Sequence, residues 1–410
     1  PFFMRRRPPR STPLTCRRQR QMCIRDSAYH EYLARCSHLL RQGEAVADIL
    51  YLTPEGVPHI FEAPEDATEG VARMRDKKGY AFDAVTPRIL ALRARVEDGR
   101  IAFPGGSKYQ VLVLPDVPAT TPETLAVIQK LVKAGANVIG NPPVKSPSLV
   151  DYPRCDAEVS RLAESIWGGT EVPAVTTCVD LGQGKVFWGG DLAPTSGLIP
   201  SYRTTASVLS ELGLPEDFSS PSGKLRYIHR RTEDCDFYFV SNRTDEPVVT
   251  DGIFRIRGRQ PQLWDPVTGT TRELANYETR GGVTSIPLSF EPHQSFFVVF
   301  PKSTAGIARP NLATTNFPVL EQITQFDGAW EVAFDPARGG PADIAFDRLQ
   351  DWTEHTEAGV RYYSGVATYR KRFELPAADD SRETQLYLDL GTVHDLCRVR
   401  LNGQQLGVVW

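Results

Sequence analysis

The sequence lacks the residue patterns that several kinds of site require. Its seven cysteines include no Cys-x-x-Cys pair, and its seven histidines include no His-Glu-x-x-His pattern. Neither a structural zinc site nor a disulfide framework is therefore expected. No apolar run reaches the roughly 20 residues that a membrane span needs, so the sequence predicts no transmembrane helix and no membrane partner.

Motifs for nucleophilic catalysis and for phosphate binding are also missing. No Gly-x-Ser-x-Gly or Gly-x-Cys-x-Gly motif occurs, and the apolar segment 137–140 is followed by Asn-Pro-Pro-Val, which offers no Ser or Cys. Gly182-Gln183-Gly184 precedes a strand-like segment instead of following one, and no Walker sequence is present. These absences argue against a serine or cysteine hydrolase and against a nucleotide-binding domain.

The net charge of −3 conceals an uneven distribution. The first 27 residues carry eight Arg and one Asp, a charge of +7, which leaves −10 for the remainder. A nucleic-acid-binding protein would need a basic folded domain, so no nucleic-acid partner is expected.

The first 27 residues show Arg clusters, adjacent prolines and no periodicity. Residues 22–27, Met-Cys-Ile-Arg-Asp-Ser, are what ATG TGT ATA AGA GAC AGC encodes, a string that contains a transposon end used in preparing sequencing libraries. Residues 6–12 likewise resemble translated adapter sequence. We therefore interpret residues 1–27 as a disordered adapter artefact, in preference to a transit peptide or a nucleic-acid arm. On this interpretation any secretion signal is missing with the true start.

From residue 28 to about 218, apolar strands alternate with amphipathic helices. This pattern predicts a three-layer α/β domain of the amidotransferase-like kind, with right-handed crossovers between parallel strands. One helix is expected to end at Gly43, and another to begin at Thr121-Pro122 and end at Gly135. The expected strands are 46–52, 111–114, 137–140 and 185–188, with a hairpin at 97–99 and a further helix at 159–166.

The remaining residues predict two further domains rich in β-structure. Short alternating strands at 225–230, 236–241 and 295–300 indicate a small β-sandwich over 219–302, followed by a linker at 303–322. Over 323–410, alternation at 368–375, a shared face at Leu386, Leu388 and Leu390, and a tight turn at Asn402-Gly403 indicate another sandwich. The sequence stops one strand after that turn, so we expect a truncated sandwich, exposed to proteolysis.

A few side chains are candidates for carbohydrate binding. Glu55 follows the first strand, at the edge where α/β sheets place ligands. Tyr80 could stack on a sugar and Asp83 could accept its hydroxyls; the alternative is a structural loop in which Asp83 caps the helix near Pro87. Trp352, Tyr362 and Tyr363 are candidates for a sugar-stacking platform, with core packing as the alternative.

Long motifs in a fixed order resemble glycoside hydrolase family 106, the α-L-rhamnosidases, over nearly everything after residue 28. The matching segments are 39–43, 46–56, 79–83, 145–149, 227–231, 263–266 and 361–365. The resemblance implies that a catalytic barrel precedes this region, so no catalytic residue is assigned here. It also implies an intact enzyme that cleaves terminal α-L-rhamnosides of glycans with inversion, and a periplasmic or extracellular parent.

The resemblance leaves alternatives open. Related large glycosidases, β-galactosidases among them, share the α/β domain and a terminal galactose-binding-like sandwich, so the resemblance implies a truncated galactose-binding-like jelly roll over 323–410. The region could therefore serve a β-galactosidase-like or other multidomain glycosidase, or act as a non-catalytic carbohydrate-binding module. An amidotransferase-like enzyme is disfavoured because its nucleophile is missing. We expect a rhamnose-containing glycan as partner and no cofactor in these residues, with a calcium ion considered for the intact enzyme alone; the oligomeric state is left open.

Overall fold

The computed structural model describes most of the chain as two compact units, 1–317 and 318–410. Residues left undescribed are 1–26, 57–60, 70–75, 195–196, 304–313, 318–320, 375–385, 392, 394–395 and 410. The predicted adapter segment thus lies outside the described residues except for Ser27, which begins helix α2 (Ser27–Leu40). Each unit is described by itself.

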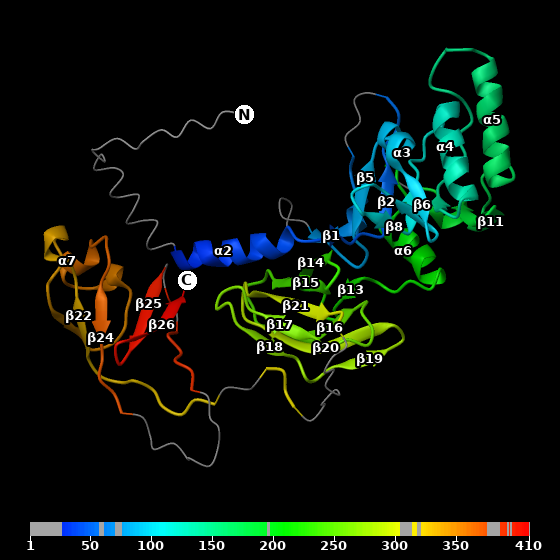
Figure 1. Cartoon of the computed structure of the whole chain (residues 1–410). Helices are drawn as coiled ribbons and strands as arrows, with labels where there is room; N and C mark the ends of the chain where they lie inside the picture. Colours follow the sequence, from blue (N-terminus) through cyan, green and yellow to red (C-terminus); the bar gives the residue numbers. More distant parts are fainter. Residues whose placement is uncertain are drawn as a thin grey trace, which may run out of the picture. The chain divides into compact units, whose positions relative to one another are not determined.

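The first part of unit 1 is a three-layer α/β domain (Figure 1). Its sheet has the order β11-β12-β10-β9-β2-β5, parallel except for β11. Apolar residues of α3, α4 and α5 cover one face, and those of α6 cover the other. The strands are β2 (Ile49–Leu52), β5 (Phe82–Val85), β9 (Val111–Val113), β10 (Asn137–Ile139), β11 (Thr177–Leu181) and β12 (Gly184–Trp188); the helices are α3 (Pro87–Arg93), α4 (Pro122–Lys133), α5 (Arg154–Trp167) and α6 (Tyr202–Glu211).

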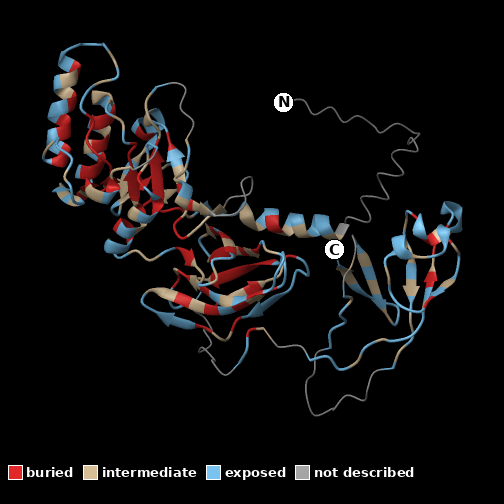
Figure 2. Cartoon of the chain, turned by 180° about the vertical axis from the view of Figure 1, so that it is seen from behind, coloured by how far each residue is buried: buried red, intermediate tan, exposed pale blue. Residues whose placement is uncertain are grey.

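Local chemistry explains where these elements begin and end. β2 and β9 are buried at every position, as strands covered by helices on both faces must be (Figure 2). The Thr121 side chain accepts a hydrogen bond from the Thr124 amide and so caps α4, as the sequence predicted. Gly168, at φ 75°, ends α5. Shorter elements complete the domain: β3 (Thr68–Glu69), β4 (Asp76–Lys77), β6 (Arg95–Glu97), β7 (Arg100–Ala102), β8 (Lys108–Tyr109), η1 (Glu65–Ala67) and η2 (Gly190–Leu192).

Two expectations near the start of the domain need correction. Helix α2 ends at Leu40, so Gly43 is not its cap. Gly43 is required for another reason: a Cβ there would lie 2.0 Å from the Arg231 carbonyl oxygen, and φ is +55°. The predicted strand 46–52 is also shorter than expected, because β2 begins only at Ile49 and the Val46 amide donates to the His229 carbonyl of the sandwich instead. The preceding residues, Glu44–Ala45, form β1, which pairs with the sandwich sheet.

The second part of unit 1 is a β-sandwich. One sheet has the order β1-β14-β15-β21-β17-β18 and the other β13-β16-β20-β19. Aromatic and branched side chains fill the space between them, and α2 packs on the outer face of the first sheet through Cys36 against Phe237 and Phe297. The strands are β13 (Phe218–Ser219), β14 (Leu225–Arg231), β15 (Cys235–Asn242), β16 (Val248–Phe254), β17 (Gln262–Trp264), β18 (Thr271–Glu273), β19 (Glu278–Arg280), β20 (Val283–Phe290) and β21 (Ser295–Pro301).

Unit 2 has a small core and little sheet among its described residues. Strands β23, β22 and β24 form one sheet, while β25 and β26 form a separate hairpin around Asn402-Gly403, as predicted. The expected strand at 386–390 is not formed: Leu386 and Leu388 are 51% and 40% exposed, and no described strand pairs with them. The elements are β22 (Trp330–Ala333), β23 (Ile344–Phe346), β24 (Thr368–Arg370), β25 (Cys397–Leu401), β26 (Gln404–Val409), η3 (Pro336–Arg338), η4 (Trp352–Glu354) and α7 (Ala358–Arg361).

Candidate functional site

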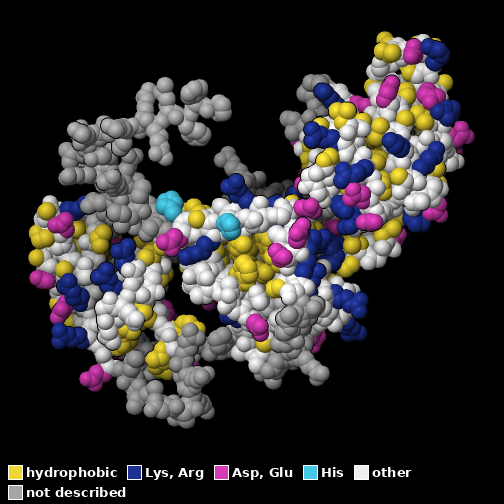
Figure 3. Space-filling model, viewed as in Figure 1, with side chains coloured by type: hydrophobic (Ala, Val, Ile, Leu, Met, Phe, Trp, Pro, Cys, Tyr) yellow, Lys and Arg dark blue, Asp and Glu magenta, His cyan; other side chains and the backbone are white. Residues whose placement is uncertain are grey.

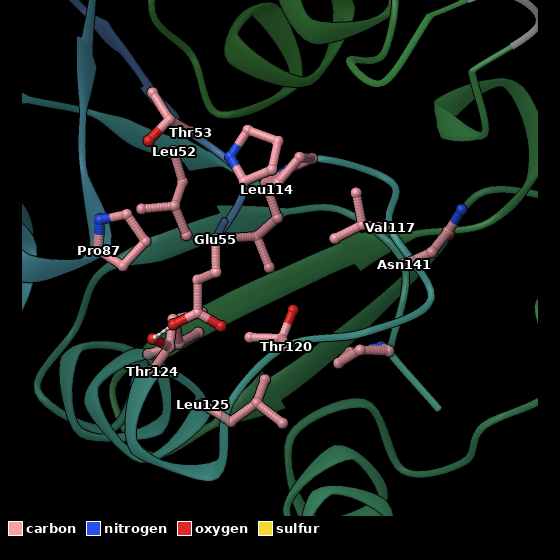
Figure 4. Close-up of a pocket in the computed structure, with 14 residues that line it drawn as sticks. Leu52, Thr53, Glu55, Pro87, Leu114, Val117, Thr120, Thr124, Leu125 and Asn141 are labelled. Atoms are coloured by element: carbon pink, nitrogen blue, oxygen red, sulfur yellow. Dashed lines mark hydrogen bonds between the residues drawn. The ribbon is translucent and has the colours of Figure 1, made fainter. Parts of the chain in front are cut away.

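The α/β sheet has a topological switch point between β2 and β9. From β2 the chain first adds β5 on one side and then adds β9 on the other. Open α/β sheets bind ligands in the crevice outside the carboxyl ends of the strands at such a point. A pocket lies there in this protein, lined by the residues that follow β2, β9 and β10, including Glu55, Val117 and Asn141 (Figure 4).

The protein's own Glu55 fills this crevice. Its carboxylate accepts hydrogen bonds from the Thr121 amide (2.7 Å), the Thr121 hydroxyl (2.8 Å) and the Thr124 hydroxyl (2.5 Å). These groups form the N-terminus of α4, the position at which related folds hold a ligand anion. The space that remains for solvent is about 20 Å³, room for about one water molecule. Glu55 was a candidate for sugar binding, and the structure places its carboxylate on α4 instead.

Replacing Glu55 with alanine should lower the free energy of unfolding of unit 1 by about 1–2 kcal/mol, because the start of α4 loses a charged capping partner. Chemical denaturation followed by circular dichroism would measure the change. Glu123 is a matched control, since it is an exposed acidic residue in the first turn of the same helix. A Glu55→Ala effect no larger than that of Glu123→Ala would contradict the assigned role.

Tyr80 and Asp83 have different surroundings from those predicted. Tyr80 is 2% exposed; its hydroxyl donates to the Leu214 carbonyl, and its amide donates to the Tyr202 hydroxyl. Burial raises the pKa of Tyr80 to about 12. The ring is therefore part of the core and offers no face to a sugar. Asp83 remains 46% exposed, accepts a hydrogen bond from the Tyr109 hydroxyl (2.9 Å) and pairs with Lys77.

Asp83 does not cap α3 either. The cap is Thr86, whose hydroxyl accepts a hydrogen bond from the Ile89 amide. Of the two roles that the sequence allowed for Asp83, helix capping is excluded, and its contact with sugar hydroxyls stays a prediction.

The three aromatic candidates in unit 2 do not form a platform. Tyr363 is 9% exposed and meets Phe334 edge to face at 4.9 Å. Trp352 donates from its indole nitrogen to the Tyr369 hydroxyl (2.6 Å) and packs against the same Phe334. Only Tyr362 of the three is open, at 79% exposure. The core alternative therefore holds for Trp352 and Tyr363.

A network of mostly buried polar side chains, here called the seam, joins the α/β domain to the sandwich through Asp48, Asp217, His229, Asp236 and Arg255. The sequence did not predict it as a site. His229 on β14 has a side chain that is 0% exposed, and it lies between two carboxylates. Its Nδ1 is 2.9 Å from Asp217 and its Nε2 is 3.1 Å from Asp236. Arg255 continues the network from Asp217 (3.2 Å) to Asp48 (2.9 Å), which precedes β2 of the α/β sheet. Ionic side chains that are mostly buried, from His229 at 0% to Arg255 at 13% exposure, thus join the two domains.

The segment 79–83 belongs to the same seam. The Tyr227 hydroxyl and the Asp217 amide both donate to the Gly79 carbonyl, at 2.8 and 3.1 Å. A Cβ on Gly79 would lie 2.4 Å from the Tyr202 hydroxyl, and φ is +57°, so glycine is required there. Part of the sequence signal was available, because a single Asp inside an apolar segment, as at Asp48 in 46–52, needs a partner when it is buried.

The charges of the seam shift one another's pKa values. Burial lowers the pKa of His229, but the neighbouring Asp217 and Asp236 carboxylates raise it more, so the net shift is upward. Burial likewise raises the pKa of Asp217, and the charges of His229 and Arg255 bring it below the usual value. The Asp236 pKa is lowered in the same way by His229 and Arg231. Asp48, with the smallest compensation, has a pKa raised by burial to about 6.

Other kinds of site are absent from the described part of the chain. No group of three or more His, Cys, Asp or Glu side chains there could hold a metal ion. No helix within the described ranges is long and apolar enough to span a bilayer. On the face seen in Figure 3, basic and acidic side chains are interspersed over the α/β domain.

Comparison with known proteins gives the family. A family model described as alpha-L-rhamnosidase matches residues 13–279. The rhamnosidase from Novosphingobium sp. PP1Y is structurally similar, with a TM-score of 0.76 and 29% identity over 93% of this chain and 34% of that one. A Formosa agariphila protein named "Putative beta-glucuronidase" is 33% identical over 275 residues, 67% of this chain and 21% of that protein. The chain therefore spans about a fifth to a third of these relatives, and it belongs to glycoside hydrolase family 106.

Proposed function

We propose that this chain is an accessory region of a glycoside hydrolase that cleaves terminal α-L-rhamnose from glycans, and that it does not catalyse hydrolysis by itself. The family match supports a carbohydrate substrate, and the name of the structurally similar enzyme supports rhamnose. The observation that carries the proposal is the filled switch-point crevice, where Glu55 takes the place of a ligand.

Inverting hydrolysis has geometric demands that this crevice does not meet. It needs an acid and a base about 6.5–9.5 Å apart on opposite sides of the sugar ring, held rigidly. Glu55 is bound to α4, and the space beside it holds about one water molecule, too little for a sugar. We therefore assign the catalytic carboxylates to the part of the longer relatives that this chain does not span. The calcium ion and the periplasmic or extracellular parent stay predictions of the same kind.

The test is an assay of the purified chain with an aryl α-L-rhamnoside. We expect no release of the aryl group above a heat-treated sample, while a full-length family member, assayed in parallel, turns the substrate over. Turnover by this chain that is abolished by Asp83→Asn would contradict the proposal, because a catalytic carboxylate would then lie within these residues. Asp83 is the informative position, since it is the candidate carboxylate that remains half exposed.

A second sugar is supported by one observation, the name of the Formosa agariphila relative. If the parent enzyme acts on glucuronides, a full-length protein carrying this region should cleave an aryl β-glucuronide and leave the α-L-rhamnoside intact. The same pair of substrates therefore distinguishes the two alternatives.

A further inference from the structure

We propose that His229 is a proton-operated latch. Its doubly protonated imidazole ring holds the sandwich to the α/β domain, and loss of one ring proton weakens the contacts between the two domains. The inference concerns regulation of the fold and does not depend on which sugar the parent enzyme cleaves. It is based on hydrogen-bond geometry, on burial and on the path by which the network crosses between the domains.

The geometry requires two protons on the ring. Each ring nitrogen of His229 is about 3 Å from a carboxylate oxygen, Nδ1 from Asp217 and Nε2 from Asp236. Both carboxylates accept other donors as well, which keeps them ionised: Asp217 from the Tyr238 hydroxyl, and Asp236 from Arg231 at 2.6 Å. A neutral imidazole has one N–H, so one nitrogen would present a lone pair to an ionised oxygen.

The network crosses from one domain to the other through Asp217. This carboxylate lies between His229 and Arg255, and the Arg255 guanidinium donates to Asp48. Asp48 is fixed within the α/β sheet, because its amide donates to the Ala81 carbonyl and its carbonyl accepts from the Gln110 amide. The His229 carbonyl also accepts from the Val46 amide (3.1 Å), so the latch residue is itself bonded across the seam.

Every charged or titratable group that faces the latch can be named. The ring contacts the carboxylates of Asp217 and Asp236, and these two carboxylates form ion pairs with Arg231, Arg255 and Arg259. The Tyr238 ring stacks on the imidazole at 3.9 Å. Tyr227 lies on the same strand as His229, and Asp48 lies beyond Arg255. The ring is closed off from water. Its proton can therefore leave only when the seam opens, which couples deprotonation to local opening.

The sign of the pH effect follows from the raised pKa of His229. A group whose folded pKa lies above its usual value, here 6.5, stabilises the fold fully below that value and loses the contribution as pH rises through the folded pKa. Asp48, with a pKa of about 6, is ionised throughout an experiment that starts at pH 7.5 or above. The alkaline range therefore isolates the histidine.

The test combines nuclear magnetic resonance with hydrogen exchange on the full chain. Imidazole ¹⁵N resonances, with seven histidines to assign, should show His229 doubly protonated at pH 7.5. Between the usual pKa of 6.5 and the raised folded pKa, protection of the Val46 and Asp217 amides, corrected for intrinsic exchange, should fall about tenfold per pH unit and then level off above the folded pKa. The Leu112 amide in the α/β core should show no such fall. His229→Gln should abolish the pH dependence, while His293→Gln, which alters an exposed His–Asp pair, should preserve it.

Three results would overturn the latch. One is a His229 ring with a single proton at pH 7.5, and another is seam protection in the wild-type chain that does not change with pH. The third is an alkaline fall that persists unchanged in His229→Gln. If His229→Gln does not fold, the wild-type resonance titration and the wild-type exchange profile still decide the question by themselves.

Discussion

Replacing Asp217 with alanine should destabilise unit 1 by about 3–5 kcal/mol, the usual effect of removing one member of a buried ion pair. The carboxylate faces His229 and Arg255 and also accepts the Tyr238 hydroxyl, all within 3.2 Å. Alanine would remove one of the two carboxylates that His229 and Arg255 each contact, and it would leave the buried Tyr238 hydroxyl without its acceptor. Urea denaturation at pH 6, followed by tryptophan fluorescence, would measure the loss.

The chain offers a matched control for this change. Asp245 pairs with His293 at 2.8 Å, the same chemical pairing, but the Asp245 side chain is 97% exposed. Asp245→Ala should change stability by no more than about 0.5 kcal/mol, since exposed ion pairs contribute little. Equal effects at the two sites would show that burial does not give the seam its importance. Asp217→Asn, which keeps an acceptor and removes the charge, separates the hydrogen bonds from the electrostatic attraction.

Limited proteolysis should degrade unit 2 well before unit 1. Among its described residues, the core of unit 2 contains five buried apolar side chains, those of Val332, Phe334, Phe346, Val360 and Tyr363. Its β25–β26 hairpin pairs with no other described strand, and a two-stranded hairpin alone is marginal in water. Digestion follows the population of open forms, so a stability difference of about 1.4 kcal/mol already gives a tenfold rate difference. Trypsin should leave a resistant fragment that ends at or after Pro301, identified by mass spectrometry.

The control for the digestion is the same chain in urea, which should be cut throughout. Cleavage within α5, for example after the exposed Arg161, before any cleavage in residues 321–374 would contradict the expected order. So would a full-length chain that survives for as long as the fragment does. Either outcome would mean that the small core of unit 2 is more stable than its buried residues indicate.

The sequence was sufficient where a local pattern decides the structure. The Thr121-Pro122 start of α4, the hairpin at 97–99 and the three long sandwich strands are all present, because caps, turns and alternation act within a few residues. The α/β arrangement with helices on both faces of a parallel sheet also follows from such patterns. The names of the individual domains, amidotransferase-like and galactose-binding-like, stay predictions.

The surroundings of Glu55 and Tyr80 depend on residues that are distant in the sequence. Tyr80 looks like an exposed aromatic in a polar loop, but Tyr202 and Leu214, more than 120 residues away, enclose it. Glu55 meets Thr121 across 66 residues, and Asp48 meets Arg255 across 207. One sequence without aligned relatives contains no information on such pairings. The family was correctly identified, and residues of three segments that suggested it, 46–56, 79–83 and 227–231, meet at the seam between the domains.

Glu55 also limits what the α/β domain can respond to. A carboxylate joined to its binding place by the same chain has an effective concentration of order millimolar or more, so dissolved anions compete poorly with it. A solute that cannot enter the folded state cannot shift the folding equilibrium. Phosphate, sulfate or sugar acids should therefore leave the melting temperature of this domain unchanged, apart from general salt effects. This crevice is therefore closed to small anions, because the carboxylate that occupies it belongs to the protein's own sequence.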